Sequence, residues 1–146
     1  MSEIFIIDEW LWADLDGKNG EKKQRETFIF LEKLYLKCDK IAVASGSKFE
    51  KKAWNFCKAA SSCQEKRKIA RFFAAVLMYN SSKYLQYEIE HSPLGMDGVK
   101  EDDAYLVKLH KETGARIITT DRKLKEALQT KNIPCELRDE FLAAYL

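Results

Sequence analysis

Apolar and polar residues alternate in two patterns along this chain, one typical of buried strands and the other of helices. The apolar runs at 4–7 and 117–120 are short and rich in β-branched residues, which predicts strands over 3–8 and 115–120. Around residue 30, apolar positions recur with the spacing of one helix face. Applied along the whole chain, the two patterns predict strand 3–8, helix 21–37, strand 40–44, helix 48–60, helix 64–79, strand 84–90, helix 100–113, strand 115–120, helix 122–131, strand 133–137 and helix 138–145.

This alternation of strands and helices predicts an α/β fold. Strands joined by helices form right-handed crossovers, so we expect a three-layer α/β/α sandwich around a central, mostly parallel sheet. Residues 1–146 contain no internal repeat or linker-like stretch, and we expect one domain. The segment 84–90 also fits a helix, and both interpretations stay open.

The composition narrows the class of protein without indicating a function. Hydrophobic residues make up 46% of the chain and charged residues 33%, as in ordinary globular proteins. No apolar run approaches the roughly 18 residues of a membrane span. The first residues also lack a signal-peptide pattern, so we expect no membrane partner and a cytoplasmic location. The net charge of +2 is too small to indicate nucleic-acid binding, and the basic clusters within 18–25, 48–58 and 66–71 fit either phosphate-binding faces or solvated helix surfaces.

The four cysteines are Cys38, Cys57, Cys63 and Cys135. They form no C-x-x-C pair and have no histidine at the spacing of a zinc site. We expect free thiols, as in a reducing compartment, while a disulfide between Cys57 and Cys63 stays open.

Three aspartates lie where a metal site would form in such a sheet. Asp8 and Asp121 each close an apolar strand, at the carboxyl edge where ligands bind in open parallel sheets. Asp103 opens the helix that leads into the second of these strands. Carboxylates gathered at one edge repel each other unless a cation or a shared proton compensates, and hard divalent cations prefer oxygen ligands. The pattern therefore predicts a Mg²⁺ or Mn²⁺ site.

Each aspartate also has a purely structural interpretation. Asp8 and Asp121 suit the start of the segment that follows each of them, where a carboxylate caps backbone N–H groups. Asp103 is favoured in the first turn of a helix by the helix dipole alone. Its neighbour Asp102 competes with it for the inward position, and helical periodicity does not decide between the two.

Glu50 has two interpretations as well. It either closes a capping box with Ser47 or leans over the edge of the preceding strand as a fourth acid. The tryptophans, which we expect in the core or in the walls of a site, are Trp10, Trp12 and Trp54.

Motifs of several other α/β proteins are absent. The chain contains neither G-x-x-x-x-G-K-[ST] nor G-x-G-x-x-G. A phosphorelay receiver would need an aspartate at the end of a strand near the middle of the chain, but strand 40–44 is followed by Ser45. A haloacid-dehalogenase phosphatase would need Asp-x-Asp after the first strand, where this chain has Asp8-Glu9-Trp10.

The C-terminal third resembles the PIN-domain nucleases. Residues 103–110 look like the family's helix that begins with a metal-binding aspartate, and residues 114–121 look like its strand ending in [Thr/Ser]-x-Asp. The resemblance spans nearly the whole chain but is specific only at 1–8 and 100–142. It implies a PIN-like fold. The residues in the family's acidic positions are Asp8, Glu50, Asp103 and Asp121.

The chain departs from the family pattern at two places. Glu9 and Trp10 follow the first aspartate, where the family often has a small hydroxyl or amide residue. His110 takes the position of a usual small residue. These changes either retune metal binding or mark a chain that has lost activity.

The resemblance implies a metal-dependent ribonuclease that hydrolyses RNA phosphodiester bonds with Mg²⁺ or Mn²⁺. Asp8, Glu50, Asp103 and Asp121 would be both its catalytic residues and its metal ligands. Hydroxyl groups of Thr119 and Thr120 are candidates for orienting these carboxylates.

The implied partners are RNA, a second copy of the chain as a homodimer and, for a toxin of a toxin-antitoxin pair, an antitoxin protein. The alternative is a catalytically inactive PIN-like module that binds RNA or protein. A receiver-type phosphoacceptor switch is a third hypothesis.

Overall fold

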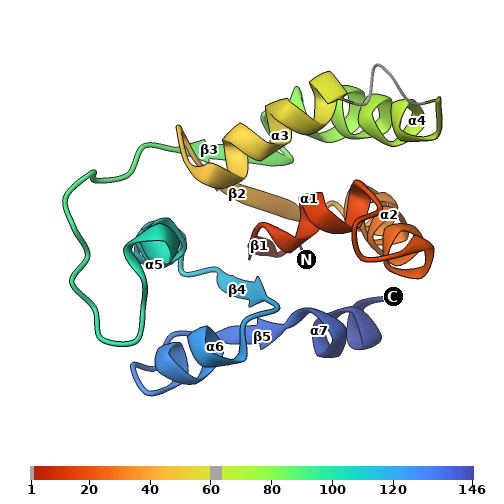
Figure 1. Cartoon of the computed structure of the whole chain (residues 1–146). Helices are drawn as coiled ribbons and strands as arrows, with labels where there is room; N and C mark the ends of the chain where they lie inside the picture. Colours follow the sequence, from red (N-terminus) through yellow and green to blue (C-terminus); the bar gives the residue numbers. More distant parts are fainter. Residues whose placement is uncertain (1, 60–63) are drawn as a thin grey trace.

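The computed structural model describes residues 2–59 and 64–146, and a parallel sheet of five strands forms its centre (Figure 1). The strands lie in the order β3-β2-β1-β4-β5, and each pair among the described residues is parallel. Their bounds are β1 Ile4–Ile7, β2 Lys40–Ala44, β3 Tyr84–Tyr87, β4 Arg116–Thr119 and β5 Cys135–Leu137. The two apolar runs that end at Asp8 and Asp121 are therefore neighbours at the centre of the sheet.

Helices cover both faces of the sheet. In Figure 1, α5 and α6 lie on one side of the strands, whereas α1, α2 and α7 lie on the other. Helix α3 packs against β2 and α1, and α7 packs against α2. The helices are α1 Trp10–Leu15, α2 Glu21–Leu36, α3 Lys48–Ala59, α4 Gln64–Phe72, the π-helix η2 Phe73–Met78, the 3₁₀ turn η3 Glu101–Asp103, α5 Ala104–Thr113, α6 Arg122–Gln129 and α7 Arg138–Tyr145.

This arrangement confirms the predicted three-layer α/β/α fold with a parallel sheet. The chain builds β1, β2 and β3 outward in one direction and then returns to place β4 and β5 on the other side of β1. The strand order thus reverses between β1 and β4. In open α/β sheets, ligands bind beside the carboxyl ends of the strands at such a reversal.

Burial on both faces of the sheet explains the consecutive apolar residues of β1 and β4. Phe5, Ile6, Ile117 and Ile118 are each 0% exposed, because helices cover both sides of β1 and β4. Each such side chain contributes about 1.5–3 kcal/mol relative to an exposed one. The ring of Phe5 packs edge-on against Phe141 of α7 at a centroid distance of 5.0 Å, which fixes α7 on the sheet.

Three features differ from the sequence prediction or resolve it. Helix α1 was not predicted, because nearly all of its six residues are buried and they show no polar face. The predicted helix 64–79 is divided into α4 and η2, and the segment 84–90 contains strand β3, so its interpretation as a strand is confirmed. Trp10 and Trp12 lie in the core as expected, whereas Trp54 is 42% exposed.

Cys38, Cys57 and Cys135 are free thiols, whereas Cys63 lies outside the described residues, so a disulfide between Cys57 and Cys63 stays untested. Burial raises the pKa of the Cys135 thiol to about 12. Within the described part of the chain, no helix combines the length and apolarity that crossing a membrane requires.

Candidate metal centre

Asp8 is held at the carboxyl end of β1 by the backbone and by neutral donors. Its N–H donates to the carbonyl of Ile118 (3.0 Å), which keeps the residue against β4. Its Oδ2 accepts a hydrogen bond from the Thr119 hydroxyl (2.8 Å), and its Oδ1 accepts from the Glu9 N–H (2.7 Å) and the Tyr105 hydroxyl (3.4 Å). Burial raises the pKa of Asp8 above its usual value, although these donors oppose the shift.

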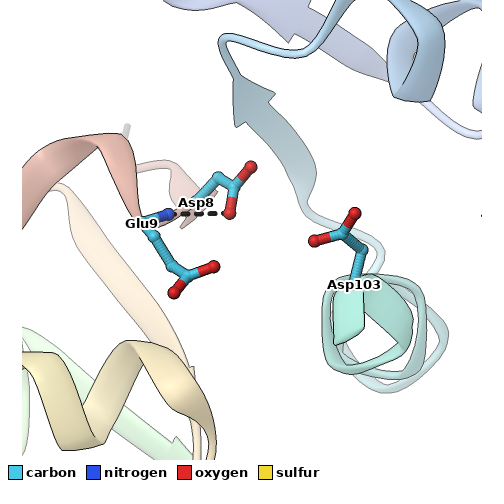
Figure 2. Close-up of side chains that lie close together, drawn as sticks. All are labelled: Asp8, Glu9 and Asp103. Carbon is cyan, nitrogen blue, oxygen red and sulfur yellow. Dashed lines mark hydrogen bonds between the residues drawn. The ribbon is translucent and has the colours of Figure 1, made fainter. Parts of the chain in front are cut away.

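Asp103 faces Asp8 from the start of α5. Figure 2 shows the two carboxylates pointing toward one another from β1 and α5. Burial raises the pKa of Asp103, the charges of Asp8, Asp121 and Glu9 raise it further, and Lys48 opposes them. An acid that repels its neighbours in this way is where a cation would be stabilised most.

Glu9 joins these two aspartates, which the sequence argument did not anticipate. Asp8, Glu9 and Asp103 each offer one oxygen, and the three oxygens lie within 4.8 Å of one another. Among the described residues, they are the group of acids, histidines or cysteines that could hold a metal ion. In the sequence, Glu9 is a departure from the PIN pattern. The one feature of the sequence that could indicate its place in the cluster is its position directly after Asp8, where the strand ends and a helix starts.

Glu9 also binds two lysines of α3. Lys52 Nζ lies 2.7 Å from one carboxylate oxygen of Glu9, and Lys48 Nζ lies 3.3 Å from the other. Burial raises the pKa of Glu9, but Lys52 and Lys48 together outweigh burial and lower it below the usual value. In Figure 2, one oxygen of this carboxylate lies on the side of α3 and the other on the side of Asp103.

Asp103, and not Asp102, is the acid that the fold turns toward Asp8. The Asp102 side chain is 81% exposed, and its nearest charged partner is Lys48 at 3.8 Å. The 3₁₀ turn η3 sets this orientation, because it ends at Asp103 and passes directly into α5.

The structure does not bring Glu50 into the cluster of three acids. Its Oε1 accepts a hydrogen bond from the Gly46 N–H (3.1 Å), and its Oε2 accepts from the Gln86 side-chain amide (2.8 Å). The Glu50 N–H donates in turn to the Ser47 hydroxyl (3.3 Å), as in a capping box. The capping interpretation thus describes its contacts, and its role as a metal ligand stays a prediction.

Asp121 performs the N-cap role that its sequence position predicts. Its Oδ1 accepts hydrogen bonds from the N–H groups of Lys123 (2.9 Å) and Leu124 (3.2 Å) at the start of α6. The Asp121 N–H donates to the Thr119 hydroxyl (3.1 Å), the same group that donates to Asp8. One buried threonine therefore ties both strand-end aspartates together. Thr120 is exposed.

The donor set of the cluster fits a hard divalent cation. Mg²⁺ binds oxygens at about 2.1 Å, so two ligands of one ion lie at most about 4.2 Å apart, and small side-chain rotations would bring the three oxygens into that range. Two of the three acids carry a raised pKa, which a bound cation would reverse.

Comparison with known proteins supports the fold and no further property. No family model matches the sequence, and no curated protein matches it. The chain is similar to one in the crystal structure of VapBC2 from Rickettsia felis bound to a DNA fragment from their promoter, with a TM-score of 0.50, 12% identity, and coverage of 92% of this chain and 98% of that chain.

This likeness supports the PIN-like fold that the sequence resemblance implies. The chain is also similar to a domain of a functionally unknown protein from Methanocaldococcus jannaschii, with a TM-score of 0.47, 18% identity, and coverage of 93% of this chain and 91% of that one.

Proposed function

We propose that this chain is a ribonuclease of the PIN type that uses Mg²⁺ or Mn²⁺ to hydrolyse RNA phosphodiester bonds. The observation that carries the proposal is the meeting of Asp8, Glu9 and Asp103 at the reversal of strand order, where two of the three carboxylates carry raised pKa values. Asp121 lies close enough for its negative charge to raise the pKa of Asp103. A bound divalent ion supplies an activated water and neutralises charge on the phosphate and the leaving oxygen.

Residues of the chain would hold the ion and orient the carboxylates. Asp8, Glu9 and Asp103 would hold the ion, and the carboxylate of Asp121 would add negative charge beside them. The hydroxyl of Thr119 fixes the orientation of Asp8. Tyr105 adds a second hydroxyl on the Asp8 carboxylate, and burial raises the pKa of that phenol, so it stays protonated and donates.

An antitoxin protein is the partner that we propose for this chain. The similar solved structure contains VapBC2 with a DNA fragment from their promoter. If this chain is the toxin of such a pair, its partner would cover the acidic cluster with a cationic side chain. Homodimer formation is a further proposal, and the oligomeric state in solution tests it.

Metal-dependent cleavage tests the proposed function directly. A mixed pool of labelled RNAs is incubated with the protein and Mn²⁺, Mg²⁺ or EDTA, and the wild type is compared with Asp8→Asn/Asp121→Asn. We expect cleavage that requires the metal and disappears in the double variant. Equal cleavage by wild type and double variant would disprove the site.

The two neighbouring aspartates of η3 provide a matched pair. We expect Asp103→Asn to lower the cleavage rate by more than about a hundredfold, because even indirect partners of metal ligands contribute about 10- to 100-fold. Asp102→Asn removes the same charge from an exposed position and should change the rate by less than about threefold. The opposite ranking would show that Asp102 is the ligand.

The second candidate function is a catalytically inactive module that binds RNA or protein. It is favoured by the contacts of Glu50, Asp121 and Glu9, which already bind backbone N–H groups, an amide or lysines of this chain. Mn²⁺ separates the two candidates. An intact site should raise the melting temperature, since a ligand at a hundred times its Kd stabilises by about 2.7 kcal/mol, whereas an inactive module should show no such rise.

A further inference from the structure

A pocket of about 300 Å³ opens between α1 and α3, directly beside the acidic cluster. It shares Glu9 with the cluster, so a molecule in the pocket would lie next to the candidate metal ion. This volume is at the lower end of small-molecule sites, which suits a single planar group such as a nucleobase. None of the functions considered so far uses this pocket.

The floor of the pocket is aromatic, and its rim is polar. Trp12 and Phe56 line it and are 4% and 5% exposed, with a centroid distance of 5.8 Å between their rings. Lys52 and Asn55 of α3 lie at the rim, three residues apart and therefore on the same side of the helix. Lys18, after α1, also lines the pocket, and its ammonium group lies 3.9 Å from the carboxylate of Asp16, a further lining residue. Apolar walls with a few polar groups at the mouth are typical of sites for amphipathic ligands.

Trp12 provides a second, independent observation. Its indole N–H is buried and has no hydrogen-bond acceptor among the described residues. A buried donor without a partner costs about 1–3 kcal/mol. Trp12, which lines this pocket, therefore carries a buried polar group that the described residues leave unsatisfied.

The lysines of α3 connect the pocket with the metal centre. Lys52 and Lys48 both bind the Glu9 carboxylate in the absence of metal. A cation bound by Asp8, Glu9 and Asp103 would neutralise the negative charge of the Glu9 carboxylate. The attraction between Glu9 and the two ammonium groups would then be weaker. Ammonium groups that are held less strongly beside a metal centre can bind the phosphate of a nucleic acid.

We propose that this pocket is the subsite for the nucleotide next to the scissile phosphate of single-stranded RNA, with Lys52 binding its phosphate and the base lying over Phe56 and Trp12. The proposal rests on the proposed nuclease function. Single-stranded RNA is the substrate class that fits, because only an unpaired base can leave its stack and enter a pocket one base deep. Lys52 is a binding residue in this scheme and takes no part in holding the metal.

Nucleotide binding tests the subsite without any cleavage. Adenosine and uridine 5′-monophosphates are titrated into ¹⁵N-labelled protein in the presence of Mg²⁺, and the indole N–H of Trp12 and the side-chain amide of Asn55 are followed by NMR. We expect saturable shifts of both signals, and much weaker binding when EDTA replaces Mg²⁺. Shifts confined to other parts of the chain, or equal binding with and without Mg²⁺, would overturn the proposal.

Neighbouring lysines give the matched control. Lys52→Gln should weaken nucleotide binding by about tenfold, the effect of one charged hydrogen bond. Lys51→Gln removes the same charge one position earlier on α3, outside the pocket, and should change binding by less than about twofold. Equal losses in the two variants would mean that general attraction, and not the subsite, binds the nucleotide.

Filling the pocket tests its shape independently of charge. Ala13 lines the pocket, and Ala13→Leu should abolish nucleotide binding while Mg²⁺ still raises the melting temperature as in the wild type. If this variant does not fold, the Lys52→Gln and Lys51→Gln comparison still decides.

The two proposals fail in distinguishable ways. RNA cleavage with an unchanged KM in Lys52→Gln and no nucleotide shifts at Trp12 would overturn the subsite and leave the nuclease intact. Nucleotide binding in the pocket without cleavage at any metal concentration would overturn the nuclease, and with it the place of the pocket beside a scissile phosphate, and would leave a pocket that only binds nucleotides.

Discussion

Two carboxylates, the buried Asp14 and the half-buried Asp8, show how differently one fold treats the same chemical group. Asp14 is 0% exposed and accepts hydrogen bonds from Arg138 Nε (2.6 Å), the Thr27 hydroxyl (2.9 Å) and the Asn19 amide (2.7 Å). Its charge is compensated by a guanidinium group that is itself almost fully buried. Among the described residues, Asp8 receives hydrogen bonds from neutral donors alone, and its charged neighbours include other acids.

The difference indicates a structural role for Asp14 and a binding role for Asp8. Arg138 joins α7 to α1 and α2 through Asp14 and Thr27, so this pair holds three helices together. At Asp8 and Asp103 the fold maintains a repulsion between carboxylates that Lys48 offsets only in part. Repulsion that persists at a sheet edge is expected where a ligand supplies the compensating charge.

The largest expected effect comes from removing the cation of the compensated pair. Arg138→Met should lower the free energy of unfolding by about 3–5 kcal/mol, because it leaves the buried Asp14 carboxylate without its partner. Urea denaturation measures this loss. Asp14→Asn should be similarly damaging, and the double variant should lose much less than the sum of the two single variants.

Arg116 supplies the control for this substitution. It pairs with Glu3 and Glu136 at 2.9 Å each, but its side chain is 33% exposed. Arg116→Met should cost no more than about 1 kcal/mol, since solvent already screens these pairs. Equal losses at Arg116 and Arg138 would remove the basis for calling the buried pair a structural lock.

A smaller effect is expected from Thr119, which connects the two strand-end aspartates. Thr119→Val keeps the shape of the side chain, but the Asp121 N–H loses its acceptor and Asp8 loses a donor. We expect a loss of about 1–3 kcal/mol in the free energy of unfolding and an affinity for Mn²⁺ lower by about tenfold. Calorimetric titration measures the affinity. Thr120→Val, at the exposed neighbour, should leave both within about 0.5 kcal/mol of the wild type.

The fold could be predicted from the sequence further than the site could. Apolar runs and helical periodicity place β1, β4 and most helices within a few residues of their observed bounds, because both patterns arise from burial along one element. The sequence pattern does not predict helix α1, because its stability comes from long-range contacts, such as the hydrogen bond from the Trp10 indole N–H to the Ile118 carbonyl (2.9 Å).

At the site, the sequence indicated those acids whose backbone position already places them at the sheet edge. Asp8 and Asp121 follow strands, so strand prediction located them. The choice of Asp103 over Asp102 depends on η3, and the inclusion of Glu9 depends on α1. Both are short elements without a periodic pattern of their own. Glu50 shows the converse, since a capping-box pattern and an acidic family position coincide in one residue and the sequence alone does not separate them.

The smallest effect, and the one that most sharpens the comparison, is the pH dependence of stability without metal. Because the pKa of Asp8 is raised in the folded state, the unfolded chain releases this proton first as the pH rises. The contribution of Asp8 therefore makes the protein less stable as the pH increases from about 3.9, the usual aspartate pKa, to the raised value in the folded state, and it stays unfavourable above that value. Asp103 acts in the same direction.

Asp8→Asn removes this unfavourable charge. In EDTA at pH 7 the variant should be more stable than the wild type, with a melting temperature higher by about 2 °C, which corresponds to less than about 1 kcal/mol for a chain of this size. The advantage should shrink as the pH falls toward 4, and Mn²⁺ should reverse it, because only the wild type gains stability from the metal. Asp102→Asn serves as the exposed control. An Asp8→Asn variant that is less stable than the wild type at every pH would show that Asp8, like Asp14, belongs to the structural carboxylates.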